Sequence, residues 1–175
     1  EERNKKLIHM LRFTCSTNLT ERQSVIAKQL KENLTTEWVI STLVPIISQK
    51  SKVSIRMMDW LCTNYSKSRN VTYAFEDNGS RRVFNLHLEY KNTLECYGRR
   101  LFDPFRRGPR CFFNIQYDEN KTQTFESTLG QLVFWKWAFD HKVLEYANEY
   151  SEDIEKDMNI AHHSRDLKKQ DGDNK

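Results

Sequence analysis

The chain has 175 residues, and its size and composition exclude several broad classes of protein. This length is typical of one domain, and 38% hydrophobic with 12% aromatic residues is enough to build a core, which excludes wholesale disorder. The formal charge of +4, from 28 basic and 24 acidic residues, is too small to indicate nucleic-acid binding by itself. No stretch approaches the roughly 18 to 20 uninterrupted apolar residues of a membrane span.

The N-terminus and the cysteines favour an intracellular setting. Residues 1–6 are mostly charged and lead into only a short apolar run, which is not the layout of a signal peptide. The four cysteines are far apart and form no CxxC pair, so we expect reduced, mostly packed thiols and not a disulfide framework. They are Cys15, Cys62, Cys96 and Cys111.

The first predicted element is a helix over residues 21–33. Thr20 and Gln23 form the pattern of a capping box, in which each side chain satisfies a backbone N–H of the first helical turn. Apolar residues then recur at helical spacing through Leu34. This combination predicts both the start of the helix and the face that it buries.

Two further helices are expected in the first third of the chain. An apolar run over residues 38–47 predicts a short buried helix, and Pro45 near its end should kink or stop it because proline lacks a backbone N–H. Ser54 is placed to cap a third helix, which continues to Tyr65 with an apolar face. The N-terminal third is therefore predicted to be helical.

The middle of the chain changes to a β-rich texture. Residues 71–75 alternate, residues 77–80 form a turn signal, and residues 83–88 supply a partner strand, which together predict a hairpin. Residues 111–117 predict a third strand that turns into a fourth over residues 122–125. We expect a small antiparallel sheet from these strands.

Two helices flank this second pair of strands. Residues 90–97 have helical spacing, and Gly98 is placed to end that helix. Ser127 or Thr128 caps the most apolar helix of the chain, over residues 129–139. So few polar positions remain on this helix that most of its circumference is expected to be buried.

The fold class that follows is α+β, with a helical N-terminal third, a small antiparallel sheet and a buried C-terminal helix. We predict one globular domain over residues 1–159. Residues 160–175 are strongly polar, with Leu167 as their main apolar side chain, and predict a disordered tail.

The most distinctive stretch is residues 97–110, where five arginines accompany one acid. Arginine binds phosphate through two parallel hydrogen bonds, aromatic rings stack on bases, and glycine and proline shape the loop that presents them. The alternative is a solvated loop anchored by Phe102 and Phe105, whose arginines pair with the acidic helix over residues 145–157. The candidate nucleic-acid-binding residues are Arg99, Arg100, Phe102, Phe105, Arg106, Arg107 and Arg110.

Neither catalysis nor metal binding is indicated by a motif. The acids over residues 145–157 point around a helix instead of converging, which is typical of a solvated face. His162 and His163 lack a cysteine or a spaced histidine partner, so we expect no zinc site. No motif nominates a catalytic base, and we expect a non-enzyme without cofactor. The histidines considered as a base are His9, His87 and His141.

Three segments carry a resemblance to a known family. They are residues 52–67, residues 90–107 and residues 128–138, and the aromatic-Asp-Pro-Phe sequence ending at Phe105 is the most specific part. Over residues 45–159 the chain resembles a conserved, uncharacterised protein family of nucleocytoplasmic large DNA viruses, the giant viruses.

The resemblance carries one departure and limited implications. The family pattern often has lysines and a cysteine around Asp-Pro-Phe, whereas this chain has Gly98, Arg99, Arg100 and Arg106 there, which weakens any metal or thiol role at that place. The resemblance implies a viral protein expressed in an infected cell, in the host cytoplasm or the virion. It implies no activity.

Two functions follow as expectations. The first is a non-enzymatic viral protein that contacts nucleic acid or a nucleoprotein assembly through the arginine-rich segment, with strong salt dependence because neutralised phosphates release counterions. The alternative is a virion structural or assembly protein whose basic loop docks on an acidic protein surface, such as residues 145–157 of a second copy in a homo-oligomer.

Overall fold

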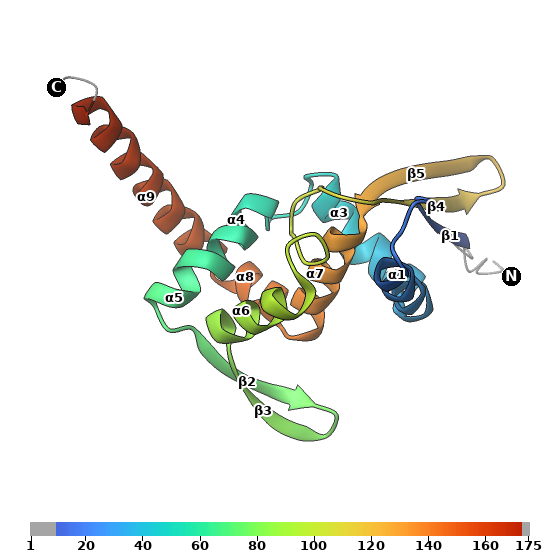
Figure 1. Ribbon diagram of the computed structural model, residues 1–175, viewed down its shortest axis with the longest axis horizontal. Helices are drawn as coiled ribbons and strands as arrows, with labels where there is room; N and C mark the ends of the chain where they lie inside the picture. The colour runs from blue at the N-terminus through green and yellow to red at the C-terminus, as the bar shows by residue number, and fades with distance from the viewer. Residues whose placement is uncertain (1–9, 173–175) are drawn as a thin grey trace, which may run out of the picture. The chain divides into compact units, whose positions relative to one another are not determined.

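The computed structural model describes residues 10–172, with side chains described for residues 11–169. The chain divides into two compact units, and Figure 1 follows their elements by colour. Unit 1 comprises residues 1–50 and 98–136, and unit 2 comprises residues 51–97 and 137–175. The single domain expected over residues 1–159 stays a prediction.

Unit 1 contains a three-stranded antiparallel sheet in the order β1-β4-β5 (Figure 1). The strands are β1 Met10–Cys15, β4 Arg110–Asp118 and β5 Lys121–Thr128. The pairing of β4 with β5 confirms the predicted strands and their turn. Strand β1 was not predicted, and its pairing places the ring of Phe13 5.1 Å from that of Phe113 across the sheet.

Helix α1 of unit 1, Glu21–Asn33, confirms the predicted helix and its cap. The hydroxyl of Thr20 accepts a hydrogen bond from the backbone N–H of Gln23 at 3.2 Å, and the side-chain oxygen of Gln23 accepts from the N–H of Thr20 at 2.9 Å. The buried face carries Ile26 and Leu30. The local pattern was sufficient here because both capping partners lie in one turn.

The second predicted helix of unit 1 consists of three consecutive pieces. These are α2 Thr36–Trp38, the π-helical turn η1 Val39–Leu43 and α3 Val44–Ile47. The wider π turn ends at Leu43, two residues before Pro45, which has no N–H to donate to the previous turn. The helix ends at Ile47, two residues after the proline, as the sequence predicts.

Unit 2 begins with the third predicted helix, which is also built from three pieces. They are α4 Ile55–Trp60, the π-helical turn η2 Leu61–Tyr65 and α5 Ser66–Ser68. The hydroxyl of Ser54 accepts from the N–H of Met57 at 3.1 Å and so caps the first turn as predicted.

A two-stranded hairpin follows, with β2 Thr72–Asp77 paired to β3 Ser80–Asn85. The prediction that the second strand continues to Leu88 is wrong, because helix α6, Leu86–Tyr97, already begins there. The side-chain oxygen of Asn85 accepts from the N–H of Leu88 at 3.1 Å, which caps the new helix. Capping by Asn85 therefore overrides the alternating pattern.

Helix α7, Leu129–Asp140, is the buried helix that the sequence predicts, and it completes the α+β fold class. Its residues 129–136 belong to unit 1 and its residues 137–140 to unit 2. The hydroxyl of Thr128 accepts from the N–H of Gln131 at 3.2 Å. The helix has 12 residues, and within residues 10–172 no helix is both long and apolar enough to cross a membrane. The buried apolar residues of α7 are Leu129, Leu132, Val133, Phe134, Trp135, Trp137 and Ala138.

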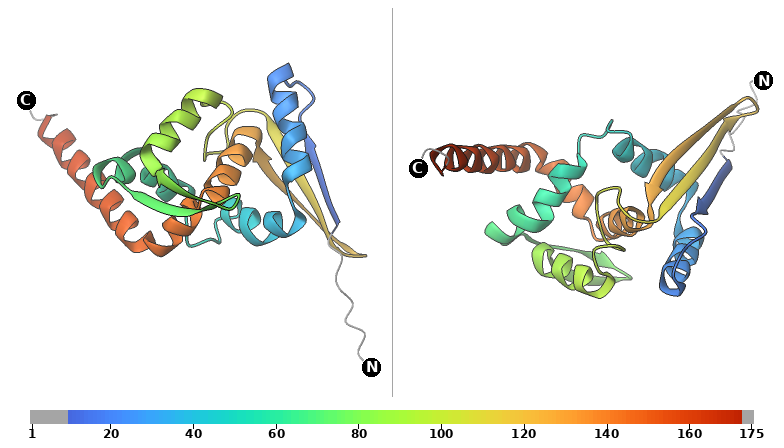
Figure 2. Two further views of the ribbon diagram at one scale, coloured as in Figure 1. Left: turned by 90° about the horizontal axis from the view of Figure 1, so that it is seen from below. Right: turned by 45° about the horizontal axis from the view of Figure 1, so that its top comes forward.

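The chain ends in α8 Val143–Glu149 and α9 Ser151–Gly172, both in unit 2. Helix α9 runs beside α4 (Figure 2) and remains helical where the sequence predicts a disordered tail. The ring of His162 lies 5.6 Å from that of Trp60, and the guanidinium carbon of Arg165 lies 5.6 Å from the Trp60 ring centre. These polar side chains cover an aromatic ring, which composition alone does not reveal. Residues 173–175 lie outside the described residues.

Candidate nucleic-acid interface

The arginine-rich segment forms a loop over residues 98–109, between α6 and β4, in unit 1. We call residues 98–110 the arginine loop. Gly98 has φ of 78° and Gly108 has φ of 91°, a left-handed backbone that favours glycine because it has no Cβ. The two glycines therefore set the turns of the loop.

The backbone of the arginine loop is hydrogen-bonded to helix α7. The N–H of Asp103 donates to the carbonyl oxygen of Gly130 at 3.2 Å. The carbonyl oxygen of Pro104 accepts from the side-chain amide of Gln131 at 3.0 Å and from the indole of Trp135 at 3.4 Å. Three bonds to one buried helix hold the loop in a defined conformation.

Close packing adds to these bonds. A Cβ atom at Gly130 would lie 2.8 Å from the carbonyl oxygen of Arg100, which is closer than real Cβ contacts, so this position requires glycine. Phe102 is 1% exposed, and its ring lies 5.1 Å from that of Phe134. Phe102 is therefore a core anchor and is not available for the base stacking that the sequence analysis allowed.

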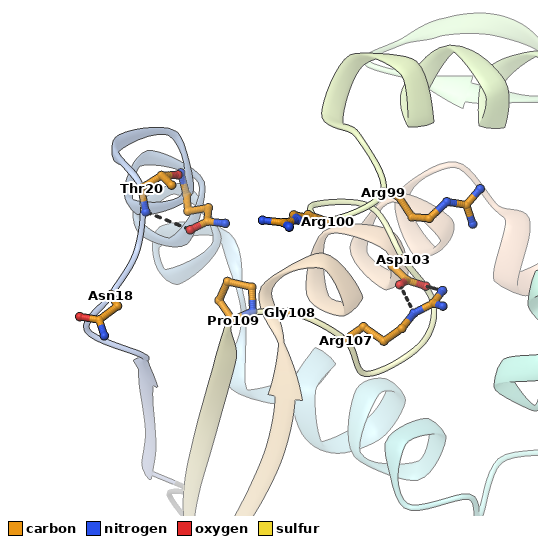
Figure 3. A pocket seen from close by; sticks show the side chains of 9 residues that line it. Asn18, Thr20, Arg99, Arg100, Asp103, Arg107, Gly108 and Pro109 are labelled. Carbon is orange, nitrogen blue, oxygen red and sulfur yellow. Dashed lines mark hydrogen bonds and ion pairs between the residues drawn. The ribbon is translucent and has the colours of Figure 1, made fainter.

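Asp103 organises the centre of the loop although it is only 4% exposed. Its carboxylate accepts two hydrogen bonds from Arg107, at 2.7 and 3.0 Å, and one from the N–H of Phe105 at 3.1 Å (Figure 3). The guanidinium of Arg107 also lies 5.2 Å from the centre of the half-buried Phe105 ring. A buried carboxylate needs such partners, so Arg107 and Phe105 already have an internal role as partners of Asp103.

Arg106 and Arg110 share a partner on β5. Glu126 lies 3.8 Å from a guanidinium nitrogen of Arg106 and 3.2 Å from one of Arg110. Arg110 also donates to the backbone carbonyl of Arg106 at 3.0 Å. The prediction that the loop arginines pair with residues 145–157 is wrong for Arg106 and Arg110, because their partner Glu126 lies in unit 1.

Arg99 and Arg100 differ from the other three arginines. Both are exposed, and neither side chain has a hydrogen bond or ion pair with any residue of the described part of the chain. In Figure 3, Arg100 points toward Thr20 at the start of α1, whereas Arg99 points away from it. Their donors are free for an external anion.

Both arginines line a surface cavity of about 620 Å³ in unit 1. Asn18, Thr20 and Gln23 line the same cavity from the start of α1. From the sequence alone, Gln23 is expected only to cap helix α1. Its position here depends on tertiary structure, and no local signal pointed to it.

The charge of the chain is concentrated in unit 1. Its sequence has 15 Lys and Arg against 9 Asp and Glu, a formal charge of +6, whereas unit 2 has 13 against 15, a formal charge of −2. The small net charge of the whole chain is therefore the sum of a basic unit 1 and a slightly acidic unit 2. The arginine loop supplies five of the basic side chains of unit 1. A positive potential of this kind attracts polyanions.

The prediction of one acidic helix over residues 145–157 is wrong, because α8 ends at Glu149 and α9 begins at Ser151. Two carboxylates of α9 have internal partners. Asp157 accepts from the indole of Trp60 at 2.8 Å and lies 3.3 Å from Arg69, while Asp153 accepts from the hydroxyl of Tyr65. Among the residues with described positions, no three His, Cys, Asp or Glu side chains gather as a metal site would require.

The histidines considered as catalytic bases are bound by backbone groups. The Nδ1 atom of His87 lies 3.2 Å from the carbonyl oxygen of Cys62, and that of His141 lies 2.8 Å from the carbonyl oxygen of Trp137. The ring of His141 stacks on Phe84 at 5.5 Å. These contacts describe packed side chains, and His9 lies outside the described residues.

Comparison with known proteins places the chain in a family. A model described as "Family of unknown function (DUF7197)" matches residues 10–175. Uncharacterized protein L507 of Acanthamoeba polyphaga mimivirus is 38% identical over 133 residues, which are 75% of this chain and 51% of that protein, so the chain spans about half the length of the curated relative. No solved structure matches. The resemblance to an uncharacterised giant-virus family is confirmed, and the chain belongs to the DUF7197 family.

Proposed function

We propose that the chain is a non-enzymatic viral protein that contacts nucleic acid through the arginine loop, with Arg99 and Arg100 as the main contacts. The observation that carries this proposal is that these two exposed guanidinium groups have no hydrogen-bond or ion-pair partner among the described residues, on a loop that is itself fixed to α7. A fixed loop loses little conformational freedom when it binds.

The internal ion pairs narrow the set of contact residues. Arg106, Arg107 and Arg110 have carboxylate partners, so they contribute positive potential more than free hydrogen-bond donors. Arg99 and Arg100 diverge (Figure 3), which suits neighbouring phosphates along a strand better than one isolated phosphate. An extended polyanion therefore fits this surface better than a small anion.

The test is fluorescence anisotropy with a labelled single strand and a labelled duplex, at low and near-physiological salt. Replacing Arg99 and Arg100 together by Ala should weaken binding roughly tenfold or more and lower the salt slope by about one per lost phosphate contact. The matched control is R81A/K91A in unit 2, which removes the same charge from two exposed positions outside the loop. The control should bind nearly as wild type does.

The outcomes separate nucleic acid from the alternative partner. Equal losses in the two double variants would mean that only net charge matters and that the loop is not the contact. A folded wild type that binds neither strand nor duplex would overturn the proposal and favour the virion-assembly alternative. In that case the loop would dock on an acidic protein surface, with a milder dependence on salt.

A further inference from the structure

Cys15 and Cys111 lie directly opposite each other on the paired strands β1 and β4 of unit 1. Their sulfur atoms are 2.7 Å apart, and both cysteines are free thiols. The neighbouring opposed pair is Ser16 and Arg110, joined by a bond from the N–H of Ser16 to the carbonyl oxygen of Arg110 at 2.8 Å. Since bonded and non-bonded pairs alternate along an antiparallel ladder, Cys15 and Cys111 occupy a non-bonded pair.

A non-bonded pair is the place in a sheet where opposed side chains come closest. Its Cα atoms are about 4.5 Å apart, which falls within the range of about 4.4 to 6.8 Å found for disulfides. The two sulfur atoms need to approach by roughly 0.65 Å to reach a disulfide bond of about 2.05 Å. The backbone therefore already holds the cysteines at bonding separation.

We infer that Cys15 and Cys111 form a reversible dithiol–disulfide site that is oxidised by a low-molecular-weight disulfide. This inference does not rest on the proposed nucleic-acid function. It adds to the expectation of packed, reduced thiols that two of them can be oxidised. Nothing in the sequence indicates that two cysteines 96 positions apart face each other.

The environment of the two sulfurs assigns their roles. Cys15 is half-buried, so a reagent reaches it, whereas Cys111 is fully buried. The hydrogen bond between the thiols lowers the pKa of Cys15 against the opposing effect of burial, and Lys31 adds to the lowering. The same hydrogen bond, together with burial, raises the pKa of Cys111. Cys15 is therefore the attacking thiol, since the thiolate is the nucleophile.

The exchange balances in two steps. The Cys15 thiolate attacks one sulfur of the external disulfide, which forms a mixed disulfide and releases a thiolate that takes up the proton Cys15 had lost. The sulfur of Cys111 then attacks the sulfur of Cys15, and the proton of the buried Cys111 thiol passes to the departing thiolate, which leaves as the second thiol. One external disulfide is reduced to two thiols, and two protein thiols become one disulfide that joins β1 to β4.

The experiment uses the full chain, reduced, desalted and incubated with oxidised glutathione. Free thiols are then alkylated, and the protein is digested with trypsin and analysed by mass spectrometry without reduction. Cleavage after Lys and Arg puts each cysteine on its own peptide. We expect peptide 13–22 joined to peptide 111–121, with the other two cysteines alkylated. The four peptides are 13–22, 57–67, 92–99 and 111–121.

Two variants control the assignment. C96S removes the exposed competitor and should still form the cross-link, whereas C15S should not. The disulfide closes a long loop, so oxidation should raise the Tm of wild type and C96S by about 5 to 15 °C and leave that of C15S unchanged. C15S is chosen because Cys15 is only half-buried, so the substitution should leave the protein folded. The peptide map of the oxidised wild type decides the question by itself.

Three results would overturn the inference. In the first, peptides 13–22 and 111–121 stay unlinked in the oxidised wild type. In the second, peptide 13–22 is joined to peptide 92–99. In the third, glutathione remains on Cys15 as a stable mixed disulfide, which would mean that Cys111 does not reach it.

Discussion

The arginine loop of unit 1 and helix α9 of unit 2 are both dense in charge, but they use that charge differently. In α9, Asp153 and Asp157 accept hydrogen bonds from aromatic side chains of the same unit, and Asp157 also pairs with Arg69. In the arginine loop, three of the five arginines have carboxylate partners, whereas Arg99 and Arg100 have none within the part of the chain that the structure describes. The two regions are therefore distinguished by which charged side chains have internal partners, and not by charge density.

The two regions are also anchored differently. The arginine loop is attached through an apolar side chain, because Phe102 is buried against Phe134. Helix α9 attaches its last turns through polar side chains that lie over Trp60. Burial of an aromatic ring stabilises far more than one exposed polar contact, so the two attachments should differ severalfold in free energy.

Loss of the loop anchor Phe102 should lower the free energy of unfolding more than any other change considered below. Replacing Phe102 by Ala should lower the free energy of unfolding by about 3 to 5 kcal/mol, because it removes a fully buried ring and leaves a cavity. Urea unfolding followed by circular dichroism measures this change. Phe105→Ala is the matched control, because replacing the half-buried Phe105 should lower the free energy of unfolding by no more than about 2 kcal/mol. Equal effects would show that Phe102 is not the specific anchor.

A smaller effect is expected on the acidic side of the comparison. Asp157→Ala should lower the free energy of unfolding by about 1 to 2 kcal/mol, because the Trp60 indole loses its acceptor and Arg69 loses an ion pair. Asp157→Asn should cost less, since the amide oxygen still accepts from the indole. Both changes are measured by urea unfolding with tryptophan fluorescence.

The control for this prediction is Glu155→Ala on the same helix. Glu155 is exposed, and its side chain has no hydrogen bond or ion pair with the residues that the structure describes, so its replacement should change the free energy of unfolding by no more than about 0.5 kcal/mol. If Glu155→Ala and Asp157→Ala were equivalent, Asp157 would belong to the solvated face that the sequence predicts, and the comparison between the two regions would fail.

Where the sequence succeeded, the decisive contacts are local. Thr20 and Gln23 lie in one turn, and the turn at Gly98 depends on its own backbone, so both were predicted correctly. Strand β1 was missed because its partner strand is about 100 residues further along the chain. Only that pairing identifies the segment as a strand.

The candidate site shows the same division. The cluster of arginines was evident from the sequence, but its internal ion pairs were not. Glu126 reaches Arg106 and Arg110 only because β5 pairs with β4. The sequence allows Phe102 to be either an anchor or a stacking ring, and only its burial in the fold identifies it as an anchor. Local sequence therefore predicted which residues gather in the loop, and tertiary structure selected Arg99 and Arg100 among them.

The smallest expected effect concerns the end of α9, where polar side chains replace an apolar anchor. Arg165→Ala should lower the free energy of unfolding by about 0.5 kcal/mol, because an exposed cation over an aromatic ring is worth little more. The more sensitive measurement is hydrogen exchange, since removing the contact over Trp60 should speed exchange of the amides over residues 160–172. Lys168→Ala, on an exposed position of the same helix, should leave that exchange unchanged.

If the two variants exchanged alike, the packing over Trp60 would not hold the helix, and its last turns would depend only on their own backbone hydrogen bonds. Isolated helical turns are marginal in water, so that result would return these residues to the disorder that their composition predicts.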